Sequence, residues 1–141
     1  MSSSNYVLAY CVRDEKILML YRSNTGFANE CYGLPGGTIE PQESAQQAII
    51  REMNEELGVT VSPQDAQLVH VMSFVGNTQG DHLVLVFAIT RWHGEITNVE
   101  SHKHSHFSWF SRANLSDNTI PRHKHIINYI LKHQLYSQEG Y

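Results

Sequence analysis

The stretch from residue 37 to residue 59, GTIEPQESAQQAIIREMNEELGV, constrains the fold more than any other part of the chain. Ser44 and Gln47 have the spacing of a capping box, in which each side chain bonds the backbone of the other residue at a helix N-terminus. Gly58 stands where a left-handed residue ends a helix. The sequence therefore predicts a loop that leads into a helix between Ser44 and Gly58.

The predicted helix has an apolar face beside an acidic face. At about 100° per residue, one stripe carries the apolar side chains of Ile49, Met53 and Leu57. The acidic side chains fall within an arc of roughly 100° beside it: Glu52, Glu55 and Glu56. Like charges one turn apart cost a bare helix roughly 0.2–0.5 kcal/mol, so this face favours a divalent cation. Hard oxygen ligands favour Mg²⁺, with Mn²⁺ as the alternative.

An acidic helix face can also be an ordinary solvated surface. The turn that precedes it, Leu34-Pro35-Gly36-Gly37, favours a metal site instead, because its glycines let a backbone carbonyl approach a cation closely. Written as G-x5-E-x7-R-E-U-x-E-E-x-G-U, with Met53 and Val59 at the aliphatic positions U, the stretch resembles the Nudix box at every specified position.

This resemblance implies an α+β fold, an α/β/α sandwich around a mixed β-sheet. It also implies an enzyme that hydrolyses nucleoside diphosphates linked to another group. The positions that match the family's metal ligands are the carbonyl of Gly37 and the carboxylates of Glu52, Glu55 and Glu56. Two further matching positions imply support of the loop and the helix: Glu43 and Arg51.

Four residues outside the box are candidates for the site. Glu100 resembles a glutamate of MutT-type members that joins the metal site or takes the proton of the attacking water, although Glu52 is an alternative base and Glu100 can also be a solvated loop acid. Arg22 matches an arginine near the substrate phosphates, or is a plain surface arginine. Asn118 lies near the family's base-reading asparagine, but its spacing to the next proline differs by one residue. Phe27 is a candidate for stacking on a base.

The substrate is narrowed mostly by markers that the sequence lacks. The region Ser73-Phe74-Val75-Gly76-Asn77 carries neither the proline typical of ADP-ribose hydrolases nor the tyrosine typical of dinucleoside polyphosphate hydrolases. The segment Trp92-His93-Gly94-Glu95 resembles MutT-type nucleoside triphosphate pyrophosphohydrolases. Hydrolysis of ADP-ribose, nucleotide sugars or dinucleoside polyphosphates remains an alternative, and a nucleotide-sensing module without turnover is an alternative of another class.

Composition sets the remaining expectations. A chain of 141 residues with 41% hydrophobic residues can bury one core, so we expect a single domain over residues 1–141. The formal charge of −4 disfavours a nucleic-acid polymer as partner but allows a small nucleotide. Without a signal segment or an apolar run of ~20 residues, the expected location is the cytoplasm, where Cys11 and Cys31 remain packing thiols. Monomer and homodimer both remain open.

The other predicted elements follow from periodicity and turn residues. Strands are predicted over residues 6–13, 17–22, 66–75, 82–92 and, as the last strand, 107–110, and a helix is predicted over 121–136. Alternating histidines at positions 102, 104 and 106 make a zinc site geometrically possible. Such a site is disfavoured because no cysteine or fourth ligand is spaced to complete a tetrahedron.

Overall fold

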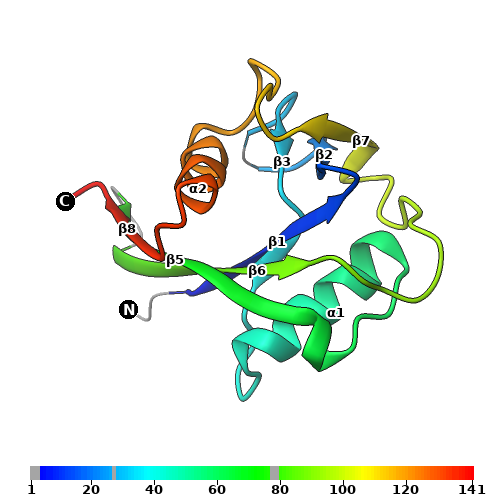
Figure 1. Cartoon of the computed structure of the whole chain (residues 1–141), viewed down its shortest axis with the longest axis horizontal. Helices are drawn as coiled ribbons and strands as arrows, with labels where there is room; N and C mark the ends of the chain where they lie inside the picture. Colours follow the sequence, from blue (N-terminus) through cyan, green and yellow to red (C-terminus); the bar gives the residue numbers. More distant parts are fainter. Residues whose placement is uncertain (1–3, 27, 77–79) are drawn as a thin grey trace.

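The computed structural model describes residues 4–26, 28–76 and 80–141, in which a mixed β-sheet lies between two α-helices. Figure 1 shows α1 (Ala45–Leu57) on one side of the sheet and α2 (Pro121–Leu131) on the other. The strands are β1 (Tyr6–Arg13), β2 (Lys16–Arg22), β3 (Tyr32–Gly33), β4 (Gly36–Thr38), β5 (Ala66–Gly76), β6 (Gly80–Ile89), β7 (His104–Ser111) and β8 (Tyr136–Glu139), and a short 3₁₀ helix, η1 (Pro63–Asp65), precedes β5. This arrangement confirms the predicted α+β sandwich.

The sheet has the strand order β3-β2-β1-β6-β5-β8, with β4 paired to β1 and β7 paired to β2. The pairs β1–β6 and β5–β8 are parallel, and the other pairs are antiparallel. Within the described residues, no helix has the length and apolar character needed to cross a membrane.

Strand β1 is apolar without interruption because both of its faces are covered. Alternate side chains of a strand point to opposite faces, and Val7, Ala9 and Cys11 pack with α1, while Leu8 and Tyr10 pack with α2. Cys11 is fully buried, which confirms it as a packing residue, and burial raises the pKa of its thiol to about 12.

Most predicted strands are confirmed, with shifted ends. The β1–β2 hairpin turns through Asp14 and Glu15, which adopt left-handed φ angles of 53° and 64°. Strand β6 ends at Ile89 rather than Trp92, and β7 begins at His104 rather than at residue 107. Trp92 and Trp109 pack on the core around α1 and stack on each other with ring centroids 6.4 Å apart.

The prediction for the C-terminal segment was wrong in two respects. The helix ends at Leu131 instead of residue 136, and β7 is not the last strand, because Tyr136–Glu139 forms β8 parallel to β5. His133 adopts a left-handed φ of 58°, which turns the chain out of the helix. Apolar periodicity continues weakly past this turn, so the local pattern alone does not mark the end of the helix.

Candidate active site

Helix α1 is the frame of the site, and its predicted local signals are all present. Ser44 and Gln47 form the capping box in both directions, and Gly58 closes the helix with φ 71° and ψ 19°. Ile49, Met53 and Leu57 are fully buried against the sheet. Because this stripe fixes the rotation of the helix, the acidic residues beside it point toward the glycine turn.

The turn before α1 contacts those acids directly. Strand β4 pairs with β1, and the Gly36 N–H donates a hydrogen bond to Glu56 Oε1 over 2.8 Å. A Cβ on Gly36 would overlap the Val7 carbonyl oxygen, and a Cβ on Gly37 would overlap the Glu52 carboxylate. Only glycine therefore lets the turn lie this close to both the sheet and the helix.

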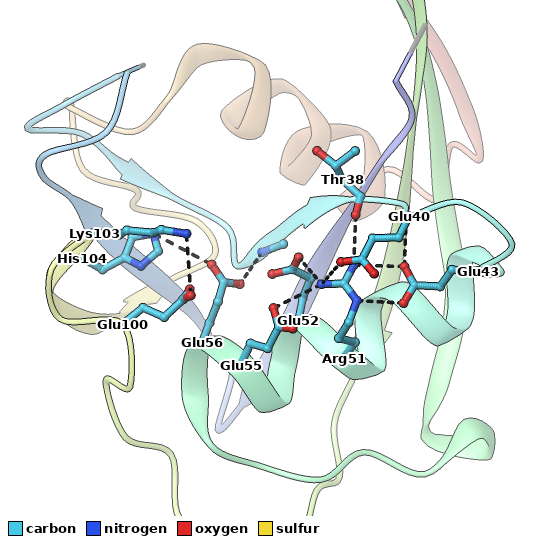
Figure 2. Close-up of polar contacts among 11 residues, drawn as sticks. Thr38, Glu40, Glu43, Arg51, Glu52, Glu55, Glu56, Glu100, Lys103 and His104 are labelled. Carbon is cyan, nitrogen blue, oxygen red and sulfur yellow. Dashed lines mark hydrogen bonds and ion pairs between the residues drawn. The ribbon is translucent and has the colours of Figure 1, made fainter. Parts of the chain in front are cut away.

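Arg51 ties the loop before α1 to the acidic face (Figure 2). Its Nε and Nη2 bind the two Glu43 carboxylate oxygens over 2.8 and 3.0 Å, and Nη2 also donates to the Thr38 carbonyl over 3.0 Å. Its Nη1 donates to Glu52 over 2.9 Å and to Glu55 over 3.2 Å. The hydrogen bond from Arg51 lowers the pKa of Glu43, and Glu43 in turn raises the pKa of Arg51.

The three glutamates of α1 have different surroundings. The Glu56 side chain is buried, whereas 48% of the Glu55 side chain is exposed. Burial raises the pKa of Glu56 well above its ordinary value, and the Glu52 charge raises it further. Burial also raises the pKa of Glu52, although its hydrogen bond with Arg51 opposes this. The protein surroundings of Glu52 and Glu56 therefore do not fully compensate the charged form of either carboxylate.

Glu100 reaches the same cluster from the loop after β6. The N–H groups of Thr97 and Val99 donate to the carbonyls of Leu57 and Glu56 over 2.9 and 3.1 Å, which fastens this loop to the end of α1. The Glu100 carboxylate lies 3.7 Å from Lys103 Nζ. Glu95 is exposed and is not among the residues that line the cleft described below.

His104 belongs to this cluster and was missed in the sequence. It is 4% exposed, and its Nε2 lies 3.9 Å from Glu56 Oε2. Burial, together with the charges of Arg22 and Lys103, lowers its pKa to about 4, so the neutral ring does not form an ion pair with Glu56. The alternation at residues 102, 104 and 106 was a signal, but His106 instead stacks on Tyr21 and hydrogen-bonds the Tyr32 hydroxyl.

These donors suit a divalent cation. The ligand atoms of Glu56, Glu100 and His104 lie within 4.8 Å of one another, and the Gly37 backbone lies against the Glu52 carboxylate. Carboxylate and carbonyl oxygens are the ligands that Mg²⁺ and Mn²⁺ prefer. The close approach at Gly37 and the uncompensated carboxylates both fit a bound cation.

A cleft of about 870 Å³ extends from the cluster. Its lining includes Arg22, Gly37, Glu40, Arg51, Glu52, Glu55, Glu56, Glu100, Lys103 and His104. Burial lowers the pKa of Arg22, while the charge of Glu56 acts in the opposite direction. The cleft thus places cationic side chains opposite the carboxylates, an arrangement that can hold a metal polyphosphate.

The lining of the cleft also includes apolar and aromatic side chains, among them Tyr6, Phe74, Val84 and Ile120. The Arg122 guanidinium lies 3.9 Å from the centre of the Phe74 ring. His123 accepts a hydrogen bond from the Leu34 N–H at Nδ1 over 2.9 Å, so its neutral ring carries the proton on Nε2. Burial and the Arg22 charge lower the pKa of His123 to about 3.

The lining of the cleft does not confirm two of the predicted substrate contacts, Phe27 and Asn118. Phe27 lies outside the described residues. Asn118 is exposed and is not among the residues that line the cleft. Its Nδ2 donates to the Glu30 carbonyl over 3.1 Å, which ties the loop before β3 to the segment before α2. His123, two residues past the start of α2, lines the cleft, but no sequence signal separated it from the other histidines.

Comparison with known proteins gives one consistent family. The profile of the NUDIX domain matches residues 4–130. An ADP-ribose pyrophosphatase of Methanocaldococcus jannaschii is 31% identical over 119 residues, which cover 84% of this chain and 68% of that protein. A CTP pyrophosphohydrolase of Escherichia coli is 29% identical, with 79% and 78% covered. The crystal structure of a MutT NUDIX hydrolase from Burkholderia pseudomallei superposes with a TM-score of 0.81 at 26% identity, covering 91% of this chain and 98% of that one.

Proposed function

We propose that this chain, which belongs to the Nudix family, converts a nucleoside triphosphate to the monophosphate and pyrophosphate with Mg²⁺ as cofactor. As a Nudix hydrolase it is an enzyme that cleaves phosphoric anhydrides in nucleoside diphosphate derivatives. The observation that carries the narrower proposal is the cleft, whose lining combines an acidic cluster, cationic side chains and aromatic side chains. Such a lining suits a metal ion, a polyphosphate and a base.

The proposed metal ligands are the Gly37 carbonyl and the carboxylates of Glu52, Glu55 and Glu56. A divalent cation held there neutralises phosphate oxygens and lowers the pKa of an attacking water. Mn²⁺ is the alternative ion, because it accepts the same oxygen donors.

The other residues of the cleft position the substrate and move the proton. Arg22 and Lys103, whose charges lie near Glu56 and Glu100, hold the phosphate chain. Glu100 joins the metal site or accepts the proton of the attacking water, with Glu52 as the alternative base. Glu43 and Arg51 hold the Glu52 carboxylate against Gly37 through the bonds between Arg51 and both glutamates.

The relatives favour two substrate classes, which differ in their products. The E. coli CTP pyrophosphohydrolase supports the triphosphate, whereas the archaeal ADP-ribose pyrophosphatase supports ADP-ribose as the alternative. Nucleotide sugars and dinucleoside polyphosphates are further alternatives. Asn118 and Phe27 remain predicted contacts of the base, and His123, which lines the cleft, offers an N–H donor.

The test is turnover of a nucleotide panel with Mg²⁺, with the products resolved by chromatography and ³¹P NMR. The proposal predicts monophosphate plus pyrophosphate from at least one triphosphate, and loss of activity with a chelator. A sugar phosphate together with a nucleoside monophosphate would redirect it to ADP-ribose or nucleotide sugars. Tight Mg²⁺-dependent nucleotide binding with no product after long incubation would favour the sensing module.

A further inference from the structure

We infer that His104 is a ligand of the bound metal, so that one imidazole nitrogen joins the carboxylate oxygens of Glu56 and Glu100. This inference rests on the proposed metal-dependent function and adds a ligand that the glutamate-rich box does not supply. Its consequence is a site that favours Mn²⁺ over Mg²⁺ more strongly than an all-oxygen site does, because imidazole suits transition metals and Mg²⁺ prefers oxygen.

The first observation is that His104 is buried without a hydrogen bond from its ring. The residue is 4% exposed, and Nδ1 has no hydrogen-bond partner in the described part of the chain. Buried polar atoms of folded proteins normally have partners. The Nε2 of the same ring lies 3.9 Å from Glu56 Oε2, which is beyond hydrogen-bond distance. The ring therefore makes no hydrogen bond to the described part of the chain, and Nε2 is the nitrogen that faces the Glu56 carboxylate.

The second observation is the spacing of the donors. Two ligands at about 2.0–2.2 Å from one ion stand roughly 3 Å apart when adjacent and roughly 4.3 Å apart when opposite. The 3.9 Å between Nε2 and Glu56 Oε2 falls within this interval. The Glu100 carboxylate is also within 4.8 Å of both. Nε2 and Glu56 Oε2 are thus too far apart for a hydrogen bond, and all three donors are close enough to share a cation.

Backbone hydrogen bonds hold Glu100 and His104 close to each other. The His104 N–H donates to the Glu100 carbonyl over 3.1 Å, which closes a single turn and carries both side chains to the Glu56 side of the loop (Figure 2). The Asn98 side chain donates to the His104 carbonyl over 2.6 Å. His104 is the first residue of β7 and pairs with Arg22 of β2. This pairing fixes the backbone of His104 in the sheet.

An unpaired nitrogen alone does not indicate a ligand, as His82 shows. His82 is also buried, and its Nε2 also has no partner within the described residues. Its ring packs against the Tyr6 and Phe74 rings, at centroid distances of 5.6 and 4.9 Å, and its Nδ1 contacts the Ser4 carbonyl. Carboxylates within reach of the ring are what distinguish His104.

The experiment uses Mn²⁺ alone as the probe, bound to the full chain without nucleotide. Electron spin echo envelope modulation detects the ¹⁴N of a directly coordinated imidazole. We expect this signal in the native protein, its change on labelling with [¹⁵N]histidine, and its loss in His104→Gln. The controls His102→Gln and His106→Gln replace the exposed neighbours and should keep it. Labelling needs no variant, so the test stands even if His104→Gln folds poorly.

Affinity gives a second readout. We expect the Mn²⁺ dissociation constant, measured from the signal of the free ion, to be about tenfold higher in His104→Gln than in the native protein. The Mg²⁺ dissociation constant, measured by competition with Mn²⁺, should change less than threefold. Stoichiometric Mn²⁺ binding to the native protein without nitrogen modulation would overturn the assignment of His104 while leaving the glutamate site and the proposed hydrolase intact. Absence of Mn²⁺ binding would overturn both His104 and the metal site.

Discussion

Two regions of this protein bury polar groups in opposite ways. At the β5–β8 edge, the ring of His70 is fully buried, and both nitrogens are bonded, Nδ1 to the Gln134 carbonyl and Nε2 to the Ser137 hydroxyl, each over 2.7 Å. Its ring also stacks on Tyr129 at a centroid distance of 5.5 Å. At the floor of the cleft, Glu56 is buried beside other carboxylates and receives one backbone hydrogen bond, from Gly36.

The hydrogen-bonded surroundings of His70 stabilise the fold, whereas the buried carboxylate of Glu56 belongs to the candidate site. A buried polar group with all its bonds made stabilises one arrangement of the chain. A buried carboxylate with a raised pKa costs stability until a cation or a proton joins it. The fold tolerates this cost at Glu56 because the capping box and the buried stripe of α1 hold the helix independently of its acidic face.

The largest effect is expected for Glu100→Gln, which keeps the size of the side chain and removes the base. We expect kcat to fall by about 10²–10⁴-fold, the usual range for a positioned acid or base, with a smaller change in KM. Glu95→Gln is the control, because Glu95 is exposed and stands apart from the cleft lining. If kcat falls strongly in Glu95→Gln and stays nearly normal in Glu100→Gln, the base is another residue, with Glu52 as the first candidate.

The second effect concerns the metal ligands of α1. Glu55→Gln and Glu56→Gln should each lower turnover by at least ~100-fold, since each removes charge that holds the cation. The fold should survive, and Glu56→Gln should unfold at an equal or higher temperature without metal, because the amide can still accept the Gly36 N–H bond and no longer bears a buried charge. Steady-state rates with circular dichroism measure both. Near-normal rates at saturating Mg²⁺ would remove these residues from the site.

The smallest effect on activity is expected around His70, where both ring nitrogens are hydrogen-bonded. His70→Gln should lower the free energy of unfolding by about 1–3 kcal/mol, the cost of disturbed buried hydrogen bonds, and leave kcat of the folded enzyme unchanged. Chemical denaturation and initial rates would measure these two quantities. A large loss of kcat with unchanged stability would reverse the assignment of roles to the two regions.

The same variant should change the pH dependence of stability. Burial lowers the pKa of His70 in the folded state, whereas an unfolded histidine has a pKa of about 6.5. Below that pH the unfolded chain binds the extra proton, so the His70 contribution is complete above pH ~6.5 and declines as the pH falls. Denaturation between pH 7 and pH 5 should therefore give a shallower decline for His70→Gln than for the native protein. Equal slopes would show that His70 does not carry this linkage.

The sequence predicted what depends on neighbours along the chain. The capping box, the apolar stripe and Gly58 are all local, so α1 and its acidic face could be derived from residues 44–58 alone. Strand β8 could not be derived in this way, because it has only four residues. Its position depends on its pairing with β5 and on the hydrogen bond of His70 to Gln134, just before β8.

The histidines of the cleft illustrate the same limit. His104 differs from its neighbours at 102 and 106 because β7 pairs with β2 and the register shifts between Tyr21 and Arg22. His123 enters the cleft because its ring accepts a hydrogen bond from Leu34, a residue far from it in the sequence. Local periodicity does not contain either contact, whereas the acids of the box were identified from their spacing and the family resemblance.

The most direct test of the contrast between the two regions is the dependence of the unfolding temperature on Mg²⁺. An ion that binds only the folded protein stabilises it by RT ln(1 + [L]/Kd), or about 1.4 kcal/mol at ten times Kd. We predict that Mg²⁺ raises the unfolding temperature of the native protein and of His70→Gln by similar amounts, and that of Glu56→Gln by much less. Equal shifts in the native protein and Glu56→Gln, or no shift in the native protein, would contradict it.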